Sequence, residues 1–199
     1  MNGNGSEERL RSRYRGSLLA GGVGDALGAP VEIMTWPEIR RTFGRRGVTD
    51  LSPAYGRIGA VTDDTQMTLF TGEGILRALS RSRNQGIGDP YRILRRSYLL
   101  WLLTQGEPPP AEEVPLEPES SWLFRIPEMK AVRLPGKTCL SALRTPPDPH
   151  SPRHRATNRS KGCGGVMRVA PRWRWQMPSA GTARGQSSIP TGWPDVSRS

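Results

Sequence analysis

Two adjacent aspartates ahead of a helical segment constrain this sequence most. Thr62, Asp63 and Asp64 precede an apolar-periodic stretch, residues 67–79, whose spacing is typical of a helix. Neighbouring side chains on a helix diverge by about 100°, whereas the irregular backbone at a helix entrance can turn both carboxylates toward one point. Mg²⁺ and Mn²⁺ prefer oxygen ligands, and two carboxylates with a hydroxyl supply half of a six-coordinate shell. Thr62, Asp63 and Asp64 are therefore placed where they can hold a cation.

The same three residues have a simpler interpretation, an ordinary capped helix. Threonine and aspartate are favoured N-caps, and acidic residues in a first turn interact favourably with the helix dipole. On these residues alone the capped helix is the favoured interpretation, so the case for a metal site depends on the rest of the chain.

The composition is that of one globular domain. The longest purely apolar run, residues 99–103, is too short to span a membrane, and the N-terminus lacks the basic and apolar regions of a signal peptide. Cys139 and Cys163 are too few for a disulfide framework and lack paired metal-ligand spacing. We therefore expect a cytoplasmic protein of about 200 residues with no membrane partner.

The net charge of +11 raises the possibility of nucleic-acid binding. Lysine occurs only at positions 130, 137 and 161, so almost all of the positive charge is arginine, and it is scattered along the chain. A solvated basic surface explains this pattern more simply, and nucleic acid is an unfavoured partner.

Helical periodicity and capping signals recur through the first three quarters of the chain. Asp89 and Pro90 form an N-cap with proline at the first helical position, and Gly106 is a stop signal. No alternating pattern of convincing length indicates a strand. The sequence therefore predicts an all-α, multi-helix fold, with helices over residues 7–24, 36–44, 67–79, 90–105, 127–134 and 138–144.

Two further segments are candidates for a functional site. Glu32 follows a proline in an otherwise apolar stretch and can line a pocket, although an exposed loop acid is the alternative. Gly162, Cys163, Gly164 and Gly165 form a loop whose amides can converge on phosphate oxygens, although a merely flexible loop explains the glycines equally well. The loop is not a Walker A motif, since no Gly-Lys-Ser/Thr ends it.

Taken together, these segments resemble the ADP-ribosylglycohydrolase family. The resemblance rests on four motifs in the family's order, which are residues 24–28 with Glu32, residues 62–65, residues 135–140 and residues 160–171. It covers roughly residues 10–171.

The resemblance implies an all-α fold with a binuclear Mg²⁺ or Mn²⁺ centre. It also implies hydrolysis of the bond that joins ADP-ribose to a modified protein side chain or a small acceptor. Carried over to this sequence, Thr62, Asp63 and Asp64 look like metal ligands, and Glu32 looks like the acidic residue beside the metals. The loop from Gly162 to Gly165 looks like the diphosphate-binding cradle.

The C-terminal segment departs from the family pattern. The family completes its metal site with a downstream Asp-x-Asp-Thr/Ser cluster, whereas residues 172–199 are rich in Arg, Trp, Pro, Ser and Gly and contain Asp195 as their only acid. We therefore expect a partial family domain over residues 1–171, truncated at its C-terminus, and an irregular tail over residues 172–199 that is either disordered or aberrant.

Three functional hypotheses follow. The first is a metal-dependent ADP-ribosyl glycohydrolase impaired by an incomplete second metal site. The second is a non-catalytic ADP-ribose or nucleotide-binding fragment that uses the glycine loop. The third is a basic nucleic-acid-binding protein.

Overall fold

A computed structural model describes residues 4–85, 89–111 and 115–146, all within one compact unit that spans residues 1–165. The helices are α1 (Asn4–Gly28), α2 (Trp36–Phe43), α3 (Asp63–Gln85), α4 (Pro90–Thr104) and α5 (Lys137–Arg144), with 3-10 turns η1 (Ala29–Val31), η2 (Pro118–Ser120) and η3 (Pro127–Lys130). In the described residues the sheet structure is one small antiparallel hairpin, β1 (Pro53–Ala54) with β2 (Arg57–Ile58). The predicted all-α fold is confirmed.

Local signals place the start and the end of α4 where the sequence predicts them. Other bounds differ, because α1 and α3 are longer than the predicted helices 7–24 and 67–79, and the predicted helix 127–134 is the 3-10 turn η3. The Asp89 carboxylate accepts a hydrogen bond of 3.0 Å from the Tyr91 amide and caps α4. Gly106 follows that helix with a φ of 77°, a left-handed conformation that glycine adopts without steric penalty. At α2, Thr35 and Glu38 form a capping box.

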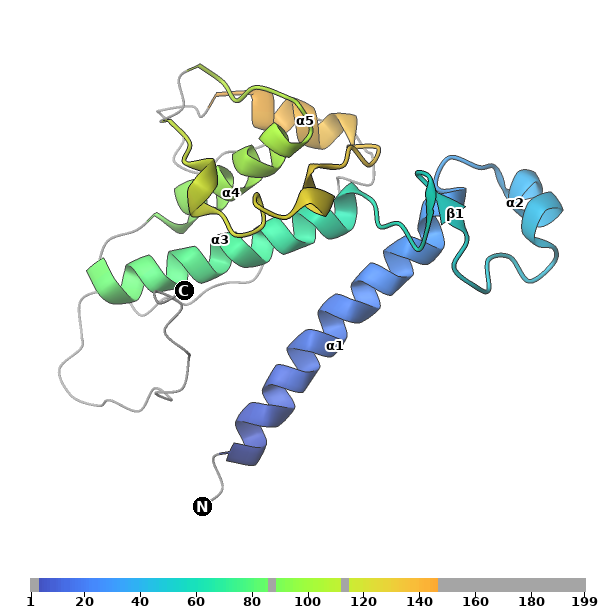
Figure 1. Cartoon of the computed structure of the whole chain (residues 1–199), viewed down its shortest axis with the longest axis horizontal. Helices are drawn as coiled ribbons and strands as arrows, with labels where there is room; N and C mark the ends of the chain where they lie inside the picture. Colours follow the sequence, from blue (N-terminus) through green and yellow to red (C-terminus); the bar gives the residue numbers. More distant parts are fainter. Residues whose placement is uncertain (1–3, 86–88, 112–114, 147–199) are drawn as a thin grey trace. The chain divides into compact units, whose positions relative to one another are not determined.

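The core lies between α3 and α4, which pack side by side (Figure 1). Phe70 on α3 and Trp101 on α4 are fully buried. Gly74 permits the close approach, because a Cβ there would lie 2.9 Å from Leu94 Cδ1 and 3.2 Å from the Leu94 Cα. A side chain at position 74 would therefore push the two helices apart.

Polar side chains on α3 also face this core. The Gln66 amide donates to the Ala131 carbonyl at 2.8 Å, and its oxygen accepts from Trp101 Nε1 and Gln105 Nε2 at 3.2 Å each. One glutamine thus joins α3, α4 and the loop after η3. Leu76, which lies in the apolar-periodic stretch of residues 67–79, is 40% exposed. The packed face of α3 combines apolar residues such as Phe70 with polar residues whose hydrogen bonds are satisfied.

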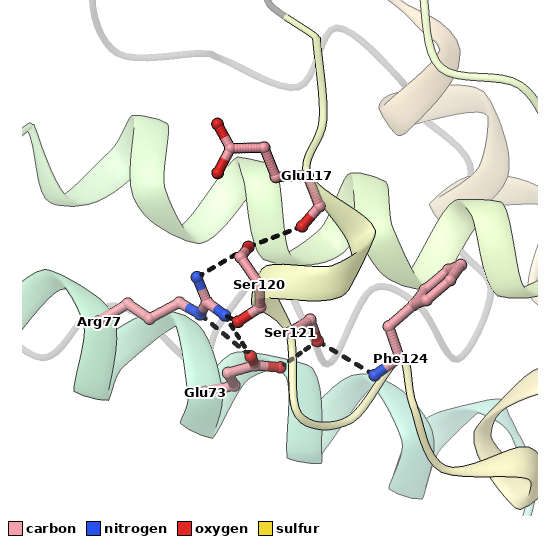
Figure 2. A network of polar contacts seen from close by, with 6 residues as sticks. All are labelled: Glu73, Arg77, Glu117, Ser120, Ser121 and Phe124. Atoms are coloured by element: carbon pink, nitrogen blue, oxygen red, sulfur yellow. Dashed lines mark hydrogen bonds and ion pairs between the residues drawn. The ribbon is translucent and has the colours of Figure 1, made fainter. Parts of the chain in front are cut away.

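The second polar network of α3 is built on Glu73, whose side chain is completely buried. Its carboxylate pairs with Arg77 at 2.9 Å and accepts a hydrogen bond of 2.8 Å from Ser121 Oγ (Figure 2). Arg77 also donates to the Ser120 carbonyl, and Ser121 Oγ accepts from the Phe124 amide at 3.1 Å. The network fastens the η2 loop to α3.

We expect Arg77→Ala to lower the free energy of unfolding by about 3 kcal/mol, because the buried Glu73 carboxylate loses its cationic partner. Chemical denaturation measures the change. The matched control is Arg83→Ala, an exposed arginine on the same helix, which should change stability by less than about 0.5 kcal/mol. Equal effects of the two substitutions would contradict a special role for Arg77.

Leu10, Tyr14 and Leu18 of α1 recur at helical spacing, and all three are exposed. Leu10, Tyr14 and Leu18 are 49%, 60% and 50% exposed, and Ala26 is the buried apolar residue near the helix end. The part of α1 that contacts the rest of the unit is therefore its C-terminal end, next to η1 and α3. None of the helices described is long and apolar enough to cross a membrane.

Candidate active site

The predicted metal-ligand segment lies at the start of α3. Asp63 and Asp64 occupy the first turn, and the Thr62 hydroxyl accepts a hydrogen bond of 3.2 Å from the Asp64 amide. Thr62 therefore caps the helix, as the simpler interpretation predicts. The cap does not exclude a ligand role, because a hydroxyl oxygen has two lone pairs and the Asp64 amide uses one.

Asp25, near the end of α1, holds this helix entrance in place. Its carboxylate accepts four hydrogen bonds, from the Thr62 amide (2.8 Å), the Thr62 hydroxyl (2.7 Å), the Thr65 amide (3.3 Å) and the Thr65 hydroxyl (2.5 Å). The two amides belong to the N-terminal groups that a helix cannot satisfy internally. A carboxylate from α1 thus fixes the orientation of the Thr62 to Asp64 segment.

Asp25→Ala should lower the free energy of unfolding by about 2 kcal/mol, because four hydrogen-bond donors lose their charged acceptor. The loss of repulsion between Asp25 and the neighbouring acids offsets part of this effect. Thermal melts compared with those of Glu8→Ala, an exposed acid on the same helix, provide the measurement. If the two variants melt alike, Asp25 does not anchor α3.

Asp63 is buried and its environment disfavours the ionised form. Burial is the main cause and, with the charges of Asp64 and Glu32, raises the pKa of Asp63 to about 6 against the opposing effect of the Gly136 amide. That amide donates to Asp63 Oδ2 at 3.1 Å, and the Asp63 amide donates to the Arg133 carbonyl at 3.1 Å. Asp63 therefore connects the start of α3 with the segment that leads into α5.

Glu32 directly follows η1, and the charges of Asp64 and Asp25 act on its carboxyl group. Partial desolvation of its carboxyl group raises the pKa of Glu32, as do the charges of Asp64 and Asp25, while a hydrogen bond from Tyr55 lowers it. The Tyr55 hydroxyl donates to Glu32 Oε2 at 3.4 Å. Burial and the Glu32 charge raise the pKa of Tyr55 to about 12, so its hydroxyl keeps its proton near neutral pH.

Four carboxylates from three segments therefore influence one another, and within the described residues none of them forms an ion pair. The pKa of Asp64 is raised too, by desolvation and by Asp25. In the described part of the chain the Asp64 carboxylate makes no hydrogen bond or ion pair. Mutual repulsion of this kind is favourable for binding a cation.

The oxygen atoms of Thr62, Asp63 and Asp64 are of the kind that binds a hard divalent cation. They are too few to complete its coordination shell. Carboxylate and hydroxyl oxygens are the ligand type that Mg²⁺ and Mn²⁺ prefer. However, residues 4–85, 89–111 and 115–146 contain no group of three or more His, Cys, Asp or Glu side chains arranged to hold a metal ion. Thr62, Asp63 and Asp64 can therefore contribute part of a shell.

Of the residues that the sequence singled out, Thr62, Asp63 and Asp64 lie at the start of α3, and the charge of Glu32 acts on Asp63. The predicted cradle, from Gly162 to Gly165, lies outside the described residues. Sequence reasoning missed two residues of the site, Asp25 and Tyr55. The glycine-flanked position of Asp25 was a usable signal, whereas contact between Tyr55 and Glu32 depends on a tertiary arrangement that spacing does not reveal.

Comparison with known proteins shows the family of this chain. The family model described as ADP-ribosylglycohydrolase matches residues 6–193, nearly the whole chain. The chain belongs to the ADP-ribosylglycohydrolase family. The acidic cluster is therefore the candidate active site of an ADP-ribosylglycohydrolase family member.

Two curated relatives resemble parts of this ADP-ribosylglycohydrolase family chain. The ADP-ribosyl-[dinitrogen reductase] glycohydrolase of Rhodospirillum rubrum is 35% identical over 94 residues, which are 47% of this chain and 29% of the relative. An uncharacterized protein of Archaeoglobus fulgidus is 37% identical over 73 residues, which are 35% of this chain and 23% of the relative. The matches thus span less than a third of either relative. No solved structure matches the chain significantly.

Proposed function

We propose that this protein hydrolyses the glycosidic bond between ADP-ribose and a modified protein side chain or a small acceptor, with the help of Mg²⁺ or Mn²⁺. The observation that carries the proposal is that the charges of Glu32, Asp63 and Asp64 act on one another, since the Asp64 charge raises the pKa of both Glu32 and Asp63. Family membership and the Rhodospirillum rubrum relative, whose name describes a glycohydrolase of an ADP-ribosylated protein, support ADP-ribose as the substrate class.

The reaction passes through an oxocarbenium-like state at the anomeric carbon of the ribose. When bound, two divalent cations would neutralise the cluster, orient the ribose hydroxyls and make a nearby water more acidic. Thr62, Asp63 and Asp64 would hold them. Glu32 would accept or deliver a proton, a role for which a raised carboxyl pKa is suited.

Asp25 and the Gly136 amide would keep the acids in position. Asp25 fixes the backbone around Thr62, and the Gly136 amide binds one oxygen of Asp63. A fixed ligand position matters because small displacements at a reacting centre reduce turnover strongly. We also assign the diphosphate of the substrate to the loop from Gly162 to Gly165, on the strength of its sequence alone.

We further propose that the 199-residue chain binds the cations weakly and turns over slowly. Its described acids provide part of a shell, and its last 28 residues contain one acid, Asp195. A family-type C-terminal segment with an Asp-x-Asp-Thr/Ser cluster, added to the chain, should raise both metal affinity and turnover.

Release of free ADP-ribose from ADP-ribosylated proteins and small acceptors tests the proposal. The enzyme is kept in excess so that slow turnover is visible, in MnCl₂ and in EDTA. We expect release that EDTA abolishes. Binding of ADP-ribose without release, in either the chain or its extended form, would favour the non-catalytic ADP-ribose-binding hypothesis instead.

A further inference from the structure

The turn between β1 and β2 has an unusual residue at its first central position. Tyr55 has a φ of 49° and Gly56 a φ of 77°, and the flanking pair Ala54 and Arg57 is in register. Positive φ at both central residues is the mark of a type I′ hairpin turn, in which Asn, Asp and Gly are strongly preferred. A bulky residue in this conformation is strained.

A strained backbone conformation suggests a functional role when the side chain of the strained residue makes a specific contact. The Tyr55 hydroxyl donates to Glu32 Oε2 at 3.4 Å, and β1 packs against η1, which directly precedes Glu32. The ring is held from another direction by Arg133, whose guanidinium carbon lies 5.4 Å from the ring centroid. Tyr55 is therefore fixed at both ends, its ring against a cation and its hydroxyl against the carboxylate.

Arg133 is well suited to hold the ring in place. It is buried, with 8% of its surface exposed, and its guanidinium donates to the Val61 carbonyl at 3.5 Å. Its own carbonyl accepts from the Asp63 amide. Arg133 thus contacts the ring of Tyr55 with its side chain and the Asp63 amide with its backbone carbonyl.

We propose that Tyr55 is a positioning residue, which holds Glu32 in the orientation that the reaction requires. The inference rests on the proposed function of Glu32 as the proton-handling acid. Glu32 needs such a contact because it is exposed at the end of a short turn and, in the described residues, Tyr55 is its hydrogen-bond partner. A glutamate in that setting samples many rotamers unless a neighbour selects one.

Two substitutions separate this role from a structural one. Tyr55→Phe removes the hydroxyl and keeps the ring contact with Arg133. Tyr55→Asn removes both the ring and the hydroxyl and introduces a residue that the turn prefers. It should therefore leave the melting temperature unchanged or raise it. The matched control is Tyr91→Phe, an exposed tyrosine on α4. A tyrosine with a purely structural role would instead lose stability in Tyr55→Asn.

Turnover of ADP-ribosylated substrate provides the first readout. Glu32→Gln should lower kcat by about 100-fold. Tyr55→Phe should lower kcat by about tenfold with little change in KM, as expected for loss of one hydrogen bond to a charged group. In the Glu32→Gln background, Tyr55→Phe should have almost no further effect. If Glu32→Gln slows the enzyme and Tyr55→Phe does not, the inference is wrong and the proposed function stands.

Nuclear magnetic resonance of protein labelled with ¹³C at tyrosine Cζ provides a readout that does not need activity. The chain has four tyrosines, and Tyr55→Phe assigns the relevant signal. Glu32→Gln should move the Tyr55 resonance and leave those of the exposed Tyr14 and Tyr91 unchanged. If the wild-type chain shows no turnover, the proposed function fails and this spectrum still decides whether Tyr55 holds Glu32: an unmoved resonance overturns the inference.

Discussion

Replacing Asp63 by asparagine should stabilise the metal-free protein at pH 7.5, by about 1 to 3 kcal/mol in free energy of unfolding. Burial and the neighbouring acids raise the pKa of Asp63 from 3.8 to about 6. The folded protein therefore binds the Asp63 proton more tightly than the unfolded chain does. The resulting stabilisation is complete below pH 3.8 and is lost as the pH rises through about 6. At pH 7.5 the ionised carboxylate destabilises the fold, and asparagine removes that charge.

Urea denaturation in EDTA at pH 4 and pH 7.5 measures this effect. Asparagine retains an oxygen that can accept from the Gly136 amide, so the variant should exceed the wild type in stability at pH 7.5 and approach it at pH 4. Asp50→Asn, a change at an exposed loop acid, is the control and should show neither effect. A variant less stable than the wild type at pH 7.5 would mean that the Asp63 charge contributes to folding rather than to function.

Asp63→Ala and Asp64→Ala should each lower kcat/KM for ADP-ribose release by at least about 100-fold. Substitution of residues that only hydrogen-bond to metal ligands typically costs about 10- to 100-fold. Each of the two aspartate substitutions removes a carboxylate from the part of the shell that the described residues supply, which leaves the cations poorly neutralised and poorly placed. Because the chain itself is expected to be slow, the comparison is made in the form extended by a family-type C-terminal segment.

The control for these variants is Glu128→Ala, which removes an exposed acid from η3. Circular dichroism establishes that every variant keeps its helices. If Asp63→Ala and Asp64→Ala retain the activity of the control, the acidic cluster is not the catalytic centre, and the capped-helix interpretation describes its whole role.

The sequence was informative wherever the determining contacts are local. The Asp89 cap lies next to the helix it starts, and the Gly106 stop signal next to the helix it ends, so spacing and residue type were sufficient to predict both. The same holds for Thr62, whose hydroxyl contacts an amide two residues away. A capping role and a ligand role use the same residue types, and for this reason local sequence left both open.

Contacts between distant segments could not be predicted in this way. Asp25 lies 37 residues before Thr62, and Glu73 lies 48 residues before Ser121, so each pairing exists only in the folded chain. Helical periodicity assumes that buried positions are apolar, and it therefore misses Gln66 and Glu73, which are buried with their hydrogen bonds made. Tyr55 was missed because its turn conformation is one that its residue type disfavours.

Binding of Mn²⁺, followed by the loss of the free-ion signal in electron paramagnetic resonance, tests the central claim most directly. The 199-residue chain should bind Mn²⁺ weakly, with a dissociation constant on the order of 10⁻⁴ M or higher. Asp64→Asn should abolish that binding, and Glu128→Gln, the matched change at an exposed acid, should leave it intact. Equal binding by the wild type and Asp64→Asn would contradict the assignment of the metal centre to the start of α3.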